Sequence, residues 1–426
     1  MYAEYRRAYE AFLSLGNLSS LGSPHTKKLG GQSLKRTGDF LTNLGNPEKQ
    51  LRFIHVAGTS GKGTVAFLLH QMIEKDRQTV GTFISPHTTS FLERFQVNDH
   101  LYDPALLTPC IVDLIKSYEE FLVDHDPLTF FELSVCLAIF AFARLEVTWC
   151  ILETICGGRF DPTNVIPAPA VAIITNIDKD HTELLGASLA EIATQKAGIM
   201  KHKSTVLCGE TRPTLKKIFT EEAILKSCAL FFIPPPALPL IQPEFGFHMQ
   251  HNAALAERAA HELDLSPQSI TSVLTKFREL PCRFETMSQN PWIILDGAHN
   301  PAKIHATVER LRSEKRKIHV LFGCGASKDA SQMLRELSKI ATTITTTRYT
   351  NDYKKAANPF ALLRLVPEPL RAGAYLDGHQ ALEAVKALTK KNEILLITGS
   401  LYLAGELRER FISEKQILEH KNSFLF

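Results

Sequence analysis

The segment that most constrains the fold runs from residue 53 to residue 64 and reads Phe-Ile-His-Val-Ala-Gly-Thr-Ser-Gly-Lys-Gly-Thr. A short apolar run leads into a glycine-rich turn, and helical periodicity follows the turn as far as Lys75. Glycines allow the backbone N–H groups of such a turn to point toward one anion, and the N-terminus of the following helix adds positive potential there. The segment therefore predicts a strand, turn and helix that together hold a phosphate group.

The side chains of this turn are suited to a nucleoside triphosphate and its metal ion. Lys62 supplies a mobile positive charge, and Thr64 offers a hydroxyl to Mg²⁺. The spacing differs from the common G-x-x-x-x-G-K-[ST] pattern, because position 56 is valine and one residue separates Lys62 from Thr64. A tight turn with an incidental lysine is the alternative, but the flanking strand and helix favour nucleotide binding. The predicted phosphate-binding residues are Gly58, Thr59, Ser60, Gly61, Lys62, Gly63 and Thr64.

Length and composition limit the classes of protein to consider. The 426 residues exceed what one hydrophobic core usually serves, so we expect two domains. The formal net charge is +3, from 48 basic and 45 acidic residues, without a basic run of the kind that binds nucleic acid. Eight scattered cysteines without a Cys-x-x-Cys pair predict free thiols in a reducing compartment. A polar N-terminus and the lack of an apolar stretch of ~20 residues predict a cytoplasmic protein that does not enter a membrane.

Apolar runs alternate with helical patterns along both halves of the chain, which predicts an α/β fold with mostly parallel sheets covered by helices. In the first half the expected strands cover residues 53–57, 79–84, 148–152, 170–175 and 205–207, and the expected helices cover residues 65–75, 130–145 and 189–197. In the second half the expected strands cover residues 292–295, 318–322, 342–346 and 394–397. We place the domain boundary near residue 286, with a phosphate-loop (P-loop) ATPase domain at residues 1–286 and a smaller Rossmann-like domain at residues 287–426.

Ligands of open parallel sheets bind at the carboxyl ends of the strands, and polar residues are concentrated at these positions here. Glu153 follows the third expected strand, where a buried carboxylate favours Mg²⁺ over a structural ion pair. Ser85 follows the second strand and could bind metal or cap a turn. His181 follows the fourth strand and could bind metal or belong to a polar loop. Lys196 lies at the C-terminal end of an expected helix, where the helix dipole alone would favour a lysine.

Two further polar clusters follow strands of the second half. Residues 296–301 read Asp-Gly-Ala-His-Asn-Pro, and residues 398–400 read Thr-Gly-Ser. Both could be ordinary turns with helix caps. Their position at strand ends of one sheet instead suggests a ligand that crosses the domain interface.

Seven motifs, in this order along the chain, resemble those of the folylpolyglutamate synthase/dihydrofolate synthase family, a branch of the Mur ligase superfamily. They begin at residues 58, 85, 157, 180, 195, 296 and 398 and read G-T-S-G-K-G-T, S-P-H, G-G-R-F-D-P-T-N, D-H-T, Q-K-A-G-I, D-G-A-H-N-P and T-G-S-L-Y. The resemblance implies a ligase in which ATP phosphorylates the carboxylate of dihydropteroate or a reduced folate. The amino group of L-glutamate then attacks the acyl phosphate. It also implies two Mg²⁺ ions, small-molecule substrates only, and a monomer.

The same resemblance implies roles for individual residues. Ser85 and Glu153 would bind the first Mg²⁺, His181 would serve the second, and Lys196 matches a lysine that is carbamylated in the family. Lys62, Lys196 and His181 would be catalytic. The remaining ATP contacts would be Asn252, Arg283 and Asp296, the glutamate side would include His299, Asn300 and Ser400, and the pterin-binding residues would be Thr129, Phe130, Phe131, Glu132, Phe160, Asp161 and Pro162. For Phe130 and Phe131, packing in the core is the alternative.

Three features depart from the family's pattern. The usual asparagine of the phosphate loop is Ser60, and the hydroxyl residue that is common at position 84 is isoleucine. The family's Leu-Gly-Leu-Glu-Arg segment, part of the pterin site, reads Gln-Ser-Leu-Lys-Arg at residues 32–36, so that the acid is replaced by Lys35 and the glycine by Ser33. These changes leave open whether the chain acts on dihydropteroate, on reduced folates or on both.

Three alternatives to this interpretation were considered. A cell-wall Mur ligase would share the ATP machinery, but it is expected to carry an additional N-terminal domain, and fewer than sixty residues precede the turn here. A nucleotide-binding homologue without catalysis is expected to have lost residues such as Lys62 and Glu153, which are present. A GTPase would need Asn-Lys-x-Asp after a strand, whereas residues 176–179 read Asn-Ile-Asp-Lys.

Overall fold

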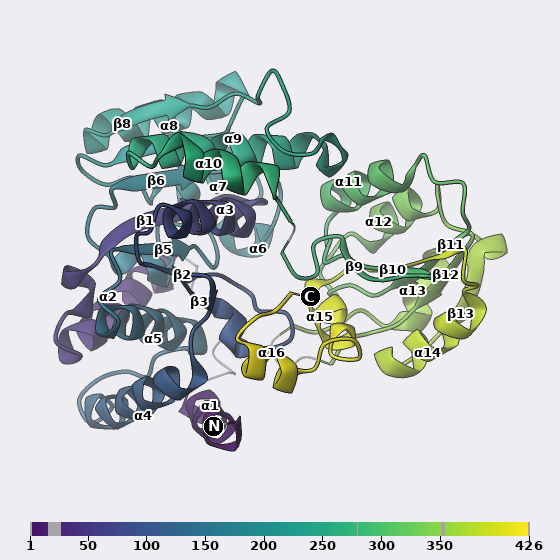
Figure 1. Cartoon of the computed structure of the whole chain (residues 1–426), viewed down its shortest axis with the longest axis horizontal. Helices are drawn as coiled ribbons and strands as arrows, with labels where there is room; N and C mark the ends of the chain where they lie inside the picture. Colours follow the sequence, from purple (N-terminus) through teal and green to yellow (C-terminus); the bar gives the residue numbers. More distant parts are fainter. Residues whose placement is uncertain (1, 16–26, 279, 351–353, 425–426) are drawn as a thin grey trace. The chain divides into compact units, whose positions relative to one another are not determined.

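The computed structural model describes residues 2–15, 27–278, 280–350 and 354–424, and its chain divides into two units (Figure 1). The first unit comprises Met1–Pro86 and Leu92–Phe277, and the second comprises His87–Phe91 and Arg278–Phe426. The chain therefore passes between the units three times, after residues 86, 91 and 277. We call residues 87–91 the strap. The second unit resumes at Arg278, a few residues before the predicted boundary, and the strap has no counterpart in the predicted division.

The first unit is built on an eight-stranded sheet in the order β4-β3-β2-β5-β1-β6-β7-β8. Its strands are β1 (Arg52–Ala57), β2 (Val80–Phe83), β3 (Phe95–Val97), β4 (His100–Leu101), β5 (Trp149–Glu153), β6 (Val171–Ile174), β7 (Thr205–Cys208) and β8 (Ala229–Phe232). The strands from β2 to β8 in this order pair in parallel, and β3 and β4 run antiparallel at one edge. All five strands predicted for this half are confirmed to within one residue at either end.

Helices cover both faces of this sheet, because the central strands are apolar on both sides. They are α1 (Tyr2–Leu15), α2 (Lys27–Asn43), α3 (Lys62–Lys75), α4 (Pro104–Phe121), α5 (Phe130–Arg144), α6 (Thr182–Leu185), α7 (Leu189–Ala197), α8 (Pro213–Lys226), α9 (Gly246–Glu262) and α10 (Pro267–Thr275). Ile54 and Val56 of β1 pack in one core with α3, α9 and α10, while Ala57 packs in another with α7 and α8. The strand that leads into the phosphate turn is thus held from both sides.

The second unit contains a six-stranded sheet in the order β13-β12-β11-β14-β10-β9. Its strands are β9 (Glu285–Gln289), β10 (Trp292–Leu295), β11 (Ile318–Phe322), β12 (Thr343–Thr346), β13 (Arg371–Ala374) and β14 (Ile394–Thr398). Its helices are α11 (Pro301–Leu311), α12 (Ala330–Leu337), α13 (Pro359–Leu365), α14 (Gly378–Leu388), α15 (Leu401–Arg408) and α16 (Glu414–His420). Only β9 pairs antiparallel, and a buried core lies on each side of the sheet. The predicted α/β architecture, with a mostly parallel sheet and a second, Rossmann-like unit, is confirmed.

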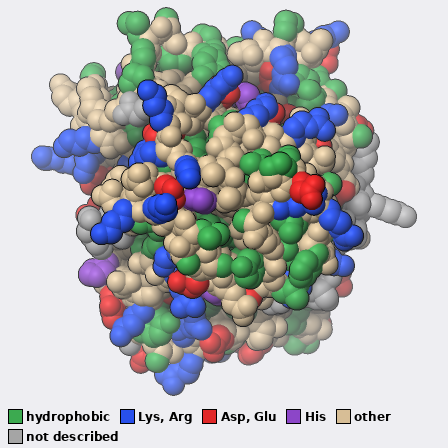
Figure 2. Space-filling model, turned by 90° about the vertical axis from the view of Figure 1, so that its right-hand side faces the viewer, with side chains coloured by type: hydrophobic (Ala, Val, Ile, Leu, Met, Phe, Trp, Pro, Cys, Tyr) green, Lys and Arg blue, Asp and Glu red, His purple; other side chains and the backbone are tan. Residues whose placement is uncertain are grey.

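Three global expectations can be compared with the structure. All eight cysteines are free thiols, and all but Cys228 are buried. Among the described residues, no helix has both the length and the apolar character needed to cross a membrane. On the face shown in Figure 2, Lys and Arg side chains are scattered among acidic and hydrophobic ones. That face therefore lacks the continuous basic patch with which proteins bind nucleic acid.

Two buried histidines brace the sheet of the first unit. Nε2 of His55 on β1 lies 2.8 Å from Thr163 Oγ1. Nδ1 of His70 on α3 lies 2.7 Å from Thr82 Oγ1 on β2, and its Nε2 bonds the carbonyl of Asn98. Burial lowers the pKa of His55 to about 3 and that of His70 to about 4. Both imidazoles are therefore neutral in the folded protein.

These histidines predict a loss of stability in mild acid. An unfolded histidine takes up a proton near pH 6.5, whereas the folded protein resists this, so stability is fully present above pH 6.5 and falls toward pH 4. Between pH 7 and pH 5, we expect the unfolding free energy of His70→Gln to decrease by about 2 kcal/mol less than that of the unaltered protein. Urea unfolding at the two pH values measures this, with the exposed His202→Gln as control. An unchanged pH dependence in His70→Gln would contradict the assignment.

Candidate active site

The glycine-rich turn between β1 and α3 has two positions with no room for a side chain. The φ angles of Gly58 and Gly61 are +148° and +82°. A Cβ atom on Gly58 would lie 1.8 Å from Thr175 Oγ1, and one on Gly61 would lie 2.3 Å from Asn252 Oδ1. Both positions therefore require glycine. The second contact also places Asn252 of α9 beside the turn, as its predicted role in ATP binding requires.

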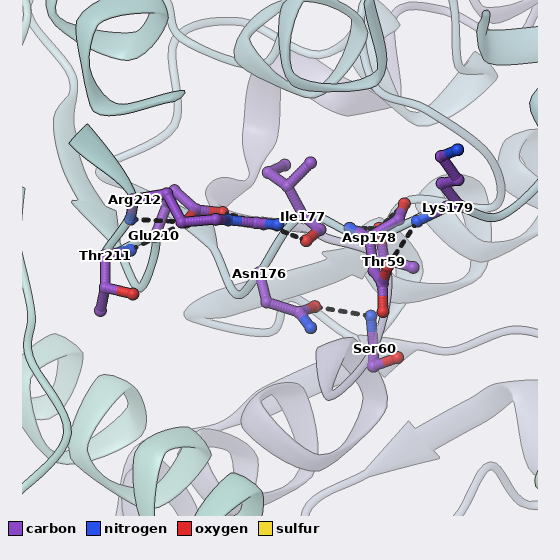
Figure 3. Close-up of polar contacts among 9 residues, drawn as sticks. All are labelled: Thr59, Ser60, Asn176, Ile177, Asp178, Lys179, Glu210, Thr211 and Arg212. Carbon is purple, nitrogen blue, oxygen red and sulfur yellow. Dashed lines mark hydrogen bonds and ion pairs between the residues drawn. The ribbon is translucent and has the colours of Figure 1, made fainter. Parts of the chain in front are cut away.

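The segment that follows β6 holds the turn in place (Figure 3). The backbone carbonyl of Asn176 accepts a hydrogen bond from the Thr59 N–H at 3.0 Å, and its side-chain oxygen accepts one from the Ser60 N–H at 2.8 Å. The Thr59 hydroxyl lies 3.1 Å from the carbonyl oxygen of Asp178 and 3.0 Å from its backbone nitrogen. Thr59 and Ser60 thus shape the turn from within. The N–H groups left to face an anion are those of the first turn of α3, which have no partner inside the helix.

Residues that follow β7 support this segment through a hydrogen bond to Ile177 (Figure 3). Arg212 donates a hydrogen bond to the carbonyl of Ile177 and lies 2.7 Å from the buried carboxylate of Glu210 in an ion pair. Asn176, Glu210 and Arg212 were not among the predicted site residues. For Asn176 a signal was available, because it directly follows a strand of the same sheet. For Glu210 and Arg212 the position after β7 offered only a weaker one.

Two lysine side chains converge on the carbonyl oxygen of Gly58. Lys196 Nζ lies 2.8 Å from this oxygen and Lys62 Nζ lies 3.2 Å from it. Lys196 is only 3% exposed, and its burial together with the charge of Lys62 lowers its pKa to about 7. The Lys196 amine is therefore partly neutral near physiological pH, unlike a lysine that only follows a helix dipole at the surface. The structure places the Lys196 side chain beside the glycine-rich turn.

Ser85 and Glu153 also meet beside this turn, at the ends of neighbouring strands β2 and β5. Glu153 Oε2 accepts a hydrogen bond from the Ser85 N–H at 3.1 Å, and Glu153 Oε1 lies 3.7 Å from Lys62 Nζ. Among the described residues, no group of three or more His, Cys, Asp or Glu side chains could hold a metal ion alone. Mg²⁺ usually binds one or two carboxylates, waters and substrate phosphates. A carboxylate and a hydroxyl beside a phosphate turn fit that mode of binding.

His181 occupies the cap position before α6 in a left-handed conformation, with φ of +50°. Its Nδ1 lies 3.9 Å from Glu183 Oε1 of the same helix. Asp180, next to it in sequence, is close enough to raise the pKa of Lys196 by its charge. The loop that carries His181 is therefore near the two lysines, while the role of His181 as a metal ligand stays a prediction.

In the second unit, the loops that follow β10 and β14 are joined to each other. The Gly399 N–H donates to the carbonyl of Ala298 at 3.0 Å. Asp296, at the start of the first loop, is buried and accepts hydrogen bonds from the Thr307 hydroxyl and from the Ala298 N–H. Burial raises the pKa of Asp296, while the hydrogen bond from Thr307 and the charge of Arg283 limit the rise. Asp296 and Arg283, both predicted ATP contacts, thus lie near each other.

The three residues predicted on the glutamate side cap helices or lie next to such caps. Asn300 is the N-cap of α11 and accepts a hydrogen bond from the Lys303 N–H at 2.9 Å. Ser400 is the N-cap of α15. His299 Nδ1 lies 2.8 Å from the carbonyl of Gly297, so Nδ1 carries the proton, and Nε2 then accepts from Lys303 Nζ at 3.1 Å. Two helix N-termini at neighbouring strand ends form a cradle suited to an anion. Lys303 was not among the predicted residues.

Several predicted pterin-binding residues make hydrogen bonds or packing contacts within the protein. Glu132 and Thr129 form a capping box at the start of α5, in which the Thr129 N–H donates to Glu132 Oε2 at 2.8 Å. Arg36 donates to the other oxygen of Glu132 at 2.7 Å. Phe130 is buried and packs edge-on against Phe12, so the core-packing alternative holds for it. Glu132 and Phe130 are thus engaged within the protein, and their contact with a heterocycle stays a prediction.

Asp161 is likewise engaged within the protein. It is fully buried and accepts hydrogen bonds from the Cys156 N–H at 2.6 Å and from the hydroxyl of Thr163 at 2.6 Å. It also caps the 3-10 turn Pro162–Val165. Asp161 therefore shapes its loop, and its contact with a pterin stays a prediction. Phe131 and Phe160 are half-buried, and their predicted contact with a pterin is untested.

Comparison with known proteins places both units. Residues 56–224 match the Mur ligase middle domain, and residues 282–401 match the Mur ligase glutamate ligase domain. A dihydrofolate synthase/folylpolyglutamate synthase from Bacillus subtilis (strain 168) is 31% identical over 88% of this chain and 94% of the relative. A folylpolyglutamate synthase from Lacticaseibacillus casei is 30% identical over 90% of this chain and 96% of the relative. The crystal structure of a folylpolyglutamate synthase from Mycobacterium tuberculosis, complexed with ADP and AMPPCP, is similar with a TM-score of 0.80, 25% identity and coverage of 89% of this chain and 95% of that chain.

The glycine-rich turn predicts a sharp effect of one methyl group. Gly58→Ala would place Cβ against Thr175 Oγ1 and force the turn to shift. We expect the Kd for ADP, measured by calorimetry, to rise at least about tenfold, which corresponds to ~1.4 kcal/mol. Gly31→Ala is the matched control, because its Cβ would meet nothing within 4 Å. Equal affinities of Gly58→Ala and the unaltered protein would show that the turn does not hold the phosphates.

Proposed function

The chain belongs to the folylpolyglutamate synthase/dihydrofolate synthase family of Mur ligases and is an ATP-dependent ligase, and on that premise we propose how its own residues carry out the reaction. The carboxylate of dihydropteroate or of a reduced folate attacks the γ-phosphorus of ATP and displaces ADP. The amino group of L-glutamate then attacks the acyl phosphate and displaces phosphate, so that an amide forms. The convergence of Lys62, Lys196 and Glu153 on one phosphate turn is the observation that carries this proposal.

A carboxylate is a poor acyl donor until one of its oxygens becomes part of a leaving group. We assign Lys62 and the N–H groups at the start of α3 to the ATP phosphates, where they stabilise charge that builds up on the transferred phosphoryl group. Asn252 lies against Gly61 and would contact the nucleotide from α9. Ser85 and Glu153 would hold a Mg²⁺ ion, which when bound neutralises phosphate charge. We assign a second Mg²⁺ to the loop that carries His181.

Lys196 is suited to carbamylation because of its lowered pKa. Its neutral nitrogen would form a bond to the carbon of CO₂, and the resulting carbamic acid would lose a proton to give a carbamate. A buried cation would thereby become an anion, which removes the repulsion with Lys62 and supplies a carboxylate beside the phosphate site. We propose that this carbamate orients the second metal ion.

The second unit would supply the remaining contacts. We assign Arg283 and Asp296 to ATP, and His299, Asn300 and Ser400 to L-glutamate, whose carboxylates suit the helix N-termini at these residues. Lys303 holds the Nε2 atom of His299 and fixes its tautomer. We further propose that the chain acts as a monomer on these small molecules.

The altered segment at residues 32–36 lies on α2 and bears on substrate choice. Lys35 is exposed and pairs with Asp39 of the same helix at 2.6 Å, while Arg36 faces Glu132. Ser33 is fully buried, and its hydroxyl has no hydrogen-bond partner among the residues that the structure describes. The Lys35 side chain thus lies on the exposed side of α2. Arg36 forms an ion pair with Glu132 in the first turn of α5. We propose that Phe131, Phe160 and Pro162 complete the pterin site.

The substrate can be identified by ADP release. With ATP, Mg²⁺ and L-glutamate, we expect dihydropteroate, tetrahydrofolate or both to stimulate ADP release, with the glutamylated product confirmed by mass. Lys62→Ala should lower the stimulated rate about 100-fold, because the ammonium group that stabilises the negative charge of the transferred phosphoryl group is lost. If only tetrahydrofolate stimulates, the changes at residues 32–36 have removed dihydrofolate synthesis. If neither stimulates, the assignment of substrate is wrong.

The carbamate can be tested through CO₂ and pH. Because the neutral form of Lys196 increases as the pH rises through about 7, we expect ADP release at fixed dissolved CO₂ to increase from pH 6 to pH 8 and to fall several-fold after CO₂ is removed. Lys201→Arg is the matched control, since Lys201 is a second lysine with a lowered pKa, of about 8, but donates to the carbonyl of Asn164. That variant should keep the CO₂ dependence. A rate that is unaffected by removing CO₂ would exclude the carbamate.

A further inference from the structure

Arg408, the last residue of α15, is the largest fully buried side chain described in the chain. Burying a guanidinium is costly unless its charge and its hydrogen bonds are satisfied. Here Nε and Nη2 donate to the two carboxylate oxygens of Glu285 at 2.7 and 2.8 Å, which is a bidentate ion pair. Nη1 donates to Thr89 Oγ1 at 3.3 Å and to Ser423 Oγ at 3.2 Å, and Nη2 also donates to the Ser423 carbonyl. All five N–H groups therefore have acceptors.

The first of these partners controls the turn that carries Arg283. Glu285 Oε2 also accepts a hydrogen bond from the Cys282 N–H at 2.8 Å, which closes the turn. Cys282 and Phe284, on either side of Arg283, both have φ of +54°, a conformation that residues other than glycine rarely adopt. Such a backbone persists only where its surroundings hold it. The Glu285 carboxylate, held in turn by Arg408, is one of the groups that hold it here.

The second partner, Thr89, lies in the strap, which groups with the second unit although its neighbours on both sides belong to the first. Two further contacts join the strap to α15 and to the next helix, α16. Ser90 Oγ donates to Glu414 Oε1 of α16 at 3.1 Å. A Cβ atom on Gly405 of α15 would lie 2.3 Å from the carbonyl oxygen of Thr88, so the helix backbone approaches the strap directly. The strap begins two residues after Ser85 in the chain.

We propose that Arg408 is a positioning residue for the ligase reaction, which binds the turn that presents Arg283 and the strap that follows Ser85 to one guanidinium. The proposal rests on the functions proposed above for Arg283 and Ser85. In this role Arg408 would contact neither substrate nor metal. Arg408 acts by fixing two chain segments, namely the turn whose Arg283 is assigned to ATP and the strap that follows Ser85, which is assigned to Mg²⁺. Lysine cannot replace it, because an ammonium lacks the five-donor fork.

The experiment separates positioning from simple stabilisation. Three variants each cut one group of contacts: Thr89→Val removes the strap contact, Ser423→Ala removes a contact to the C-terminal segment, and Arg408→Lys removes the fork. We expect Thr89→Val to raise the Mg²⁺ concentration for half-maximal ADP release at least about fivefold, with little change in Tm, because a hydrogen bond to a charged group is lost. Arg408→Lys should also raise the Mg²⁺ concentration for half-maximal ADP release, and it should raise the KM for ATP as well. Ser423→Ala should lower Tm while leaving both kinetic quantities unchanged.

Two controls and a double variant complete the test. Thr220→Val on α8 and Arg312→Lys at the C-cap that follows α11 alter exposed residues of the same types and should change nothing. Adding Thr89→Val to Arg408→Lys should raise the Mg²⁺ requirement no further, because both changes break the same link. If Thr89→Val and Arg408→Lys fold but keep the Mg²⁺ and ATP dependence of the unaltered enzyme, or if their effects add fully, the proposal is wrong. Failure of the unaltered enzyme to release ADP with any folate would instead overturn the proposed function.

Discussion

The carbonyl oxygen of Gly58 is the group on which the phosphate site depends. It turns toward Lys62 and Lys196 because Gly58 adopts a positive φ, and the backbone can do so only where no Cβ meets Thr175. Two ammonium groups on one buried oxygen repel each other. The repulsion is relieved in part by Glu153, which lies 3.7 Å from Lys62, and in part by loss of a proton from Lys196. The charge of the whole site therefore depends on one amine.

Burying the charged form of Lys196 lowers the stability of the folded protein. A shift of the Lys196 pKa from 10.5 to about 7 corresponds to roughly 5 kcal/mol of unfavourable free energy for the charged form. This is comparable with the entire stability of many proteins. A neutral side chain of similar length would pack there without the penalty. A lysine at this position therefore costs stability, which agrees with the clustering of strongly shifted pKa values at functional sites and with the role proposed for Lys196.

The extent to which the site follows from sequence depends on the range of the interactions involved. The central strands and the phosphate turn could be predicted, because continuous apolar runs and glycine spacing are local signals. The capping roles of Glu132 and Asp161 also had local signals, because Thr129-Phe-Phe-Glu132 is a capping-box pattern and Asp161-Pro162 is the start of a capped turn. The position of Lys196 against Gly58, 138 residues away in sequence, depends on the register of the whole sheet. Helical periodicity and residue type alone do not predict it, and only the resemblance of residues 195–199 to a family motif singled out Lys196.

The strap shows the same limit more strongly. Nothing in the residues from 87 to 91 indicates that they pack with helices that begin after residue 400, because the acceptor, Thr89, and the donor, Arg408, are each unremarkable in their own segments. Buried ion pairs contribute little net stability, since desolvation cancels most of the attraction. What the pair of Arg408 with Glu285 does provide is geometry, because a bidentate fork fixes direction as well as distance. In a chain whose ligands come from loops of separate sheets, a buried arginine that satisfies several segments at once is a means of setting their positions together.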